Sequence, residues 1–134
     1  MNHFQSALLV LLFSLIPLAA GAAEYDGAEL YMANCSNCHG VYGEGDGIVT
    51  PALAVVLQDL RYISEQNGGT FPRQVITEII DGRDLRVAHG PDGMPVWGNA
   101  FSHTEGYSDA AQSRVGAKIE ALVDFVESMQ IHSD

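Results

Sequence analysis

The stretch Asn34–Gly40, which reads NCSNCHG, contains both cysteines of this 134-residue chain. Cys35 and Cys38 are separated by two residues, and His39 directly follows the second thiol. Cysteines at this spacing serve as redox-active thiol pairs, as half of a zinc site, or, with the adjoining histidine, as the attachment site of a c-type haem. The rest of the chain has to decide among these three uses.

The surroundings of the motif favour haem attachment. A zinc site needs four ligands, and no second pair of Cys or His stands at a usable spacing. A thiol redox pair belongs at the start of a helix among βαβ units, whereas here the motif follows an expected helix in a chain without strand signals. We therefore expect Cys35 and Cys38 to form thioethers with one haem, and His39 to bind its iron. A thiol oxidoreductase remains an alternative.

The amino terminus indicates export. Residues 7–20, ALLVLLFSLIPLAA, form an apolar run that is shorter than the roughly 20 residues of a membrane span. Small residues suited to cleavage follow, so residues 1–23 are predicted to be a cleaved secretory signal peptide and residues 24–134 the mature haem domain. The leading segment lacks Lys and Arg, which leaves an uncleaved membrane anchor as the alternative. We expect a periplasmic protein without stable membrane insertion, in an oxidising compartment.

The charge of the chain limits its partners. Its net charge is −11, and the predicted signal peptide carries no Asp, Glu, Lys or Arg. An acidic protein repels nucleic acid and anionic lipid, so we expect redox partner proteins with basic docking surfaces. Solubility is the alternative explanation of the acidic surface, and charge alone does not choose between the two. Four of the six cations, Arg61, Arg73, Arg83 and Arg86, lie in the middle of the chain, where they either neutralise an anionic group or decorate helix surfaces.

The hydrophobic pattern predicts an all-α domain of three to five helices joined by long loops. Expected helical segments are 26–35, 71–82 and 108–130, with one or two further turns in 52–60. Glycines and prolines predict loops at 40–51 and 83–98. So few helices give a thin core. Two cysteines are too few for a set of disulfides, so a metal or a prosthetic group is expected to stabilise it.

A haem iron bound by His39 has a sixth coordination position to fill. The candidates in the sequence are Met32, Met94, Met129, His89, His103 and His132. Met94 is preferred because it stands between a glycine and a proline in an irregular segment, where a gap-filling role in a core is not expected. His89 is the second choice. A His39–Met94 pair is typical of electron-carrying cytochromes.

With these features, residues 25–130 resemble the class I c-type cytochromes. The resemblance depends on CSNCHG, on the glycine-rich loop that leads to Pro51, on GMPVWG (93–98) and on the two terminal helices. It implies the cytochrome c fold, in which long loops wrap around one covalently attached haem. It also implies a one-electron carrier that performs no bond chemistry of its own.

The resemblance also implies roles for further residues. The carbonyl of Pro51 would accept the ring N–H of His39, and Trp97 would lie along the haem edge. Gly27, Tyr31 and Phe125 would form the crossing of the first and last helices. The resemblance does not identify the arginine that pairs with the haem propionates, and Arg61 is the candidate.

Two other functions remain open at this point. The domain could be the haem c electron-acceptor subunit of a periplasmic dehydrogenase complex. It could also be a haem enzyme or sensor with an open iron position, if Met94 is not a ligand.

Overall fold

The structure, a computed structural model, describes residues 24–83 and 93–131. These residues form six α-helices: α1 (Gly27–Asn34), α2 (Ser36–His39), α3 (Ile63–Gln66), α4 (Arg73–Asp81), α5 (Trp97–Glu105) and α6 (Asp109–Ser128). Two short 3-10 helices, η1 (Thr50–Ala52) and η2 (Leu60–Tyr62), lie between α2 and α3. The described residues contain no strand, so the all-α class is confirmed. Four of these helices have at least eight residues, and α2 and α3 are single turns.

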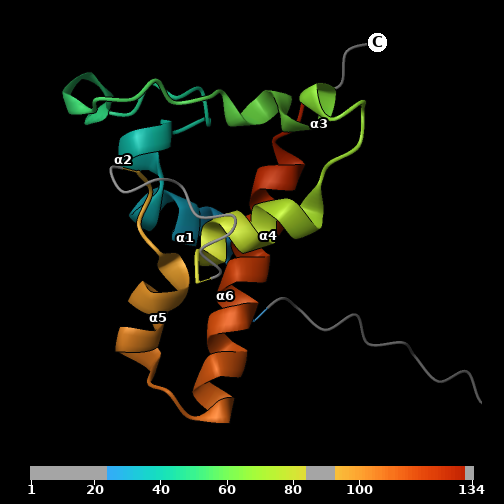
Figure 1. Cartoon of the computed structure of the whole chain (residues 1–134). Helices are drawn as coiled ribbons and strands as arrows, with labels where there is room; N and C mark the ends of the chain where they lie inside the picture. Colours follow the sequence, from blue (N-terminus) through green and yellow to red (C-terminus); the bar gives the residue numbers. More distant parts are fainter. Residues whose placement is uncertain (1–23, 84–92, 132–134) are drawn as a thin grey trace, which may run out of the picture.

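The long helix α6 is the centre of the fold, and α1, α4 and α5 all pack against it (Figure 1). The apolar stripe of α6 supplies most of the buried core, as its helical spacing predicts. Core residues from α6 are Val115, Ile119, Leu122, Val123 and Val126, joined by Tyr31, Ile80 and Phe101. Within the described residues we found no helical segment with the length and hydropathy that a membrane span requires.

The first and last helices cross at Gly27, as expected. A Cβ atom at Gly27 would overlap the carbonyl oxygen of Ala121, so only glycine allows α1 to approach α6 this closely. One turn later the fully buried ring of Tyr31 packs against Phe125, with 5.1 Å between ring centroids. The crossing fixes the direction of α1 and therefore the place where the cysteine motif begins.

Helix ends agree well with the sequence signals. Asp26 caps α1 by accepting the amides of Ala28 and Glu29, at 2.8 and 3.2 Å. Ser108 caps α6 by accepting the amide of Ala111 at 3.3 Å. Gly82 ends α4 with φ 67°, the left-handed conformation that favours glycine at this position.

Two expectations about elements were wrong. Residues 53–59 are not helical; this segment extends away from α6 (Figure 1), and Val56 is 96% exposed. Its apolar side chains line a cavity, described below, instead of packing in the core. The segment 83–98 was expected to be irregular, but α5 begins at Trp97. Gly98 and Asn99 are poor helix formers, so the start of α5 gives little signal.

The expected signal peptide (1–23) lies outside the described residues. So do Arg86 and two of the alternative iron ligands, His89 and His132.

Candidate functional site

The cysteine motif forms one turn of helix at the end of α1. The amide of Cys35 closes α1 by donating to Tyr31 O at 2.8 Å, and α2 begins at the next residue. Cys35 O then accepts the amides of Cys38 at 3.1 Å and His39 at 2.9 Å. Residues three and four apart on a helix lie on the same side, so both thiols and the imidazole project from the same side of this turn.

The glycine-rich loop after His39 holds this turn in place. Its backbone amides donate to the last carbonyl groups of α2: Gly45 to His39 (2.8 Å), Gly47 to Cys38 (3.1 Å) and Val49 to Asn37 (3.0 Å). These carbonyls have no partner inside so short a helix, and the loop satisfies them. Gly45 has φ 77°, a conformation that other residues rarely adopt. The loop therefore builds the site; it is more than the simple bend that its composition indicates.

Two side-chain hydroxyl groups reach the same turn. Tyr31 Oη donates to Gly40 O at 2.8 Å, and Thr50 Oγ1 donates to Cys38 O at 2.7 Å. Burial raises the pKa of Tyr31, so its hydroxyl remains a protonated donor. Thr50 had not been singled out from the sequence, and Tyr31 only for the helix crossing.

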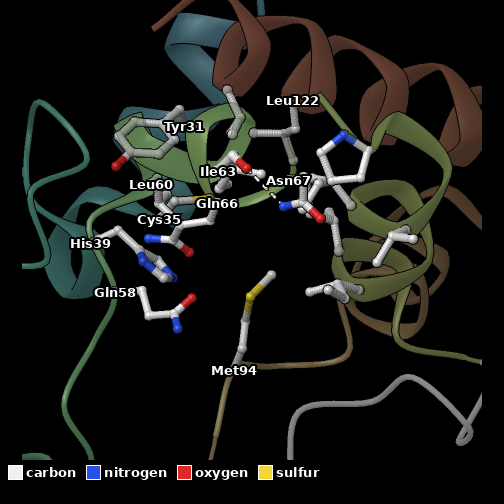
Figure 2. Close-up of a pocket in the computed structure, with 16 residues that line it drawn as sticks. Tyr31, Cys35, His39, Gln58, Leu60, Ile63, Gln66, Asn67, Met94 and Leu122 are labelled. Carbon is white, nitrogen blue, oxygen red and sulfur yellow. Dashed lines mark hydrogen bonds between the residues drawn. The ribbon is translucent and has the colours of Figure 1, made fainter. Parts of the chain in front are cut away.

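Two adjoining cavities, of about 610 and about 250 Å³, lie beside the motif. Residues that line both are Cys35, His39, Gln58, Leu60 and Met94, and Cys38 lines the larger one. Figure 2 shows the imidazole of His39 and the thioether of Met94 projecting into the space of the smaller cavity from separate segments. Met94 follows the motif by more than fifty residues in the sequence, so the fold alone brings these groups together.

The cavity walls are mainly apolar. α4 and α6 line the smaller cavity with Val75, Ile76, Ile79, Ile80, Leu122 and Val126. The segment 53–57 and Trp97 line the larger one. Trp97 also stacks on Phe101, with 5.6 Å between ring centroids. The amides of Gln58, Gln66 and Asn67 add polar groups that no sequence pattern had marked.

The other candidate iron ligands within the described residues lie elsewhere. Met129 packs against the core cluster, and Met32 is 45% exposed. His103 is exposed on α5, where its Nδ1 lies 3.3 Å from the hydroxyl of Tyr107. Neither cavity has these three residues in its lining, whereas Met94 lines both.

The roles expected for Arg61 and Pro51 stay predictions. The Arg61 guanidinium forms ion pairs with Asp59 (2.7 Å) and Glu44 (2.5 Å). Its hydrogen bond to Asp59 holds the pKa of that carboxyl below its usual range. Arg61 does not line either cavity. Pro51 is exposed in η1, directly after the Thr50 that bonds to Cys38.

The residues on these walls fit a c-type haem. Cys35 and Cys38 supply two thiols within one helical turn, as attachment to two vinyl groups requires. His39 and Met94 supply an imidazole nitrogen and a thioether sulfur, both of which bind haem iron in cytochromes. The larger cavity, at about 610 Å³, lies within the ~300–1,000 Å³ typical of cofactor sites.

Comparison with protein families agrees with this site. The model of the family described as cytochrome C oxidase, cbb3-type, subunit III matches residues 22–112, which include Cys35, Cys38, His39 and Met94. No curated protein and no solved structure matches the chain. Domains of this kind are c-type cytochromes, which carry electrons through haem c and typically act outside the cytoplasm. Because the match spans more than half of its length, the chain belongs to the cytochrome C oxidase, cbb3-type, subunit III family and has the cytochrome c fold.

Proposed function

We propose that the chain is an exported, periplasmic one-electron carrier with a single haem c joined to Cys35 and Cys38 and bound at iron by His39 and Met94. One observation supports this proposal above all others. Two thiols, an imidazole and a thioether, contributed by two distant segments, line one set of adjoining apolar cavities.

Bound haem would supply an iron that alternates between the ferric and ferrous states. Met94 would favour the ferrous state, because a thioether is a soft ligand that donates weakly to ferric iron. The apolar walls would act in the same direction, because they disfavour the extra charge of ferric haem. By binding the iron, His39 and Met94 would keep substrates away from the metal. The Pro51 carbonyl would fix the tautomer of His39, and Trp97 would cover the haem edge.

We also propose redox partners with basic docking surfaces. The chain carries 17 acidic and 6 basic side chains. Every Arg and Lys among the described residues forms an ion pair with a carboxylate. The remaining surface charge is therefore acidic, which steers a basic partner during encounter.

Replacement of the distal ligand tests the proposal. Wild-type holoprotein should show the added mass of one haem and the red absorption band of a methionine bound to ferric iron. Met94→Ala should keep the haem but lose that band, lower the reduction potential and bind added cyanide or imidazole more tightly. The matched control is Met32→Ala, which removes an exposed methionine outside both cavities.

Three results would contradict the ligand assignment. They are a wild-type spectrum without the band, a Met94→Ala variant that keeps its potential and excludes added ligands, and a Met32→Ala variant that behaves like Met94→Ala. Normal holoprotein from His39→Ala would contradict the proximal assignment.

The family description favours a second candidate function. It names a subunit of an oxidase, so the domain could serve as the haem c subunit of a larger periplasmic oxidoreductase, either an oxidase or a dehydrogenase. Stoichiometric copurification with a catalytic subunit from native membranes or periplasm would favour this function. A freely diffusing holoprotein would favour the carrier.

A further inference from the structure

The residues directly before and after His39 each accept a hydrogen bond from a side-chain hydroxyl at their carbonyl oxygen. Cys38 O, on the amino-terminal side, accepts Thr50 Oγ1 at 2.7 Å. Gly40 O, on the carboxy-terminal side, accepts Tyr31 Oη at 2.8 Å. Both bonds come from outside α2, so they restrain the backbone of His39 from two directions.

Tyr31 connects this turn to the core of the molecule. Its side chain is fully buried, packs on Phe125 at the crossing of α1 and α6, and lines the smaller cavity. The position of Gly40 therefore depends on the best-packed part of the fold. A buried hydroxyl that breaks its hydrogen bond to a carbonyl is left without a partner, which costs free energy. The bond from Tyr31 is therefore a strong restraint on Gly40 O.

Thr50 supplies the opposite restraint from η1. Its neighbour Pro51 has a restricted φ and thus stiffens the segment that carries the hydroxyl. The two bonds together restrain the backbone on both sides of His39, at Cys38 and at Gly40, and through it the direction of the imidazole.

We propose that Tyr31 and Thr50 are positioning residues that hold His39 in the orientation that iron binding requires. This inference rests on the proposed function, in which His39 is the proximal ligand. A well-oriented imidazole donates more strongly to ferric iron, so loss of either hydroxyl should raise the reduction potential.

The test uses holoprotein with Tyr31→Phe or Thr50→Val, each of which keeps the shape of the side chain. Both carbonyls retain a backbone donor, because Gly43 N bonds to Gly40 O (3.3 Å) and Gly47 N to Cys38 O (3.1 Å). The variants should therefore fold. Matched controls are Tyr107→Phe, which removes an exposed hydroxyl in the loop between α5 and α6, and Thr77→Val, which removes a hydroxyl that bonds to Arg73 O within α4.

Two measurements give the outcome. Hydrogen exchange of the His39 and Gly45 amides should be roughly fivefold faster in Tyr31→Phe and Thr50→Val, relative to amides of α6, because each variant loses one hydrogen bond at this turn. Their reduction potentials should rise, whereas the controls should keep the wild-type potential and the wild-type exchange pattern.

Two results would overturn the positioning role. One is a reduction potential of Tyr31→Phe and Thr50→Val equal to that of the controls. The other is amide exchange that is faster by the same factor along the whole chain of these variants. The wild-type spectrum separates this failure from failure of the proposed function. Absence of a His/Met haem spectrum in wild-type protein would reject the ligands themselves, whereas a normal wild-type spectrum with unchanged variants would reject only the role of Tyr31 and Thr50.

Discussion

At the scale of single residues, burial alters the chemistry of Cys35. It raises the pKa of this thiol to about 12, with a smaller contribution from Cys38. The thiolate is the nucleophilic form in thiol–disulfide exchange, and redox-active cysteines have lowered pKa values. A thiol that stays protonated at neutral pH is unsuited to exchange, so the site argues against a thiol oxidoreductase. A thioether has no proton to lose, and burial does not penalise it.

Glu105 provides a pH-dependent prediction at the same scale. It lies at the end of α5 and forms ion pairs with Arg114 (2.8 Å) and Lys118 of α6, which lower its pKa. A carboxylate with a lowered pKa stabilises the fold above its unfolded-state pKa of about 4.3, and this contribution is lost as pH falls through the folded-state value. We expect Glu105→Gln to lower the melting temperature of the holoprotein at pH 7.

The difference in melting temperature between wild type and Glu105→Gln should shrink as the pH falls below about 4. Glu65→Gln, at an exposed glutamate on α3, is the control and should have little effect at either pH. Thermal melts of the haem absorption at a series of pH values measure the difference. A difference in melting temperature between wild type and Glu105→Gln that stays constant from pH 7 to pH 3 would contradict the ion-pair explanation.

At the scale of elements, the site depends on how α1 meets α6. Gly27 permits the contact, Tyr31 packs inside it, and the cysteine motif follows within one turn of the end of α1. The glycine-rich loop then holds the motif from the other side. An error in the crossing would therefore displace Cys35 and His39 together.

Two glycines on the crossing helices should respond oppositely to alanine. Gly27→Ala should lower the free energy of unfolding by about 1–3 kcal/mol, because the new methyl group overlaps the Ala121 backbone. Gly116→Ala should raise it by ~0.5–1 kcal/mol, because Gly116 lies inside α6 with no described atom within 4 Å of the added Cβ, and alanine is the better helix former. Denaturant unfolding of both holoproteins measures the two values. Equal effects of the same sign would show that contact at the crossing is unimportant.

At the scale of the whole molecule, apolar surface is divided between a core and a cavity. The helices α1, α4, α5 and α6 bury one set of side chains around α6. The segment 53–57 faces the larger cavity, and Val55 and Val56 are left exposed. Side chains on cavity walls bury less surface than side chains in a packed core, so a group that fills the cavity would complete the hydrophobic interior.

The net charge of −11 gives a prediction for electron transfer. The reduced holoprotein should react faster with a cationic one-electron oxidant, such as a ruthenium hexaammine derivative, as ionic strength is lowered. Its reaction with the anion ferricyanide should show the opposite salt dependence. Stopped-flow rates between ~10 and ~500 mM salt measure both trends. If the anion reacts faster at low salt, the proposed preference for basic partners is wrong.

Much of the fold was predictable from local signals. The caps Asp26 and Ser108, the stop at Gly82 and the apolar stripe of α6 all depend on neighbouring residues, so they can be read without a structure. The segment 53–59 and the start of α5 were not predictable. Apolar residues that line a cavity cannot be distinguished in the sequence from apolar residues that pack in a core. At the start of α5, Trp97 and Phe101 form too short an apolar pattern to identify a helix.

The sequence by itself determined the grouping of two thiols and an imidazole, because Cys35, Cys38 and His39 lie within one turn, where spacing along the chain fixes spacing in space. It also determined the acidic charge and the helical class. Only the tertiary structure decided that Met94 shares a cavity with His39, that Arg61 pairs with Glu44, and that Tyr31 and Thr50 bond to the carbonyls of the residues beside His39. The reason is physical. These contacts join residues of different elements and loops, and their distances depend on how the chain folds around the site.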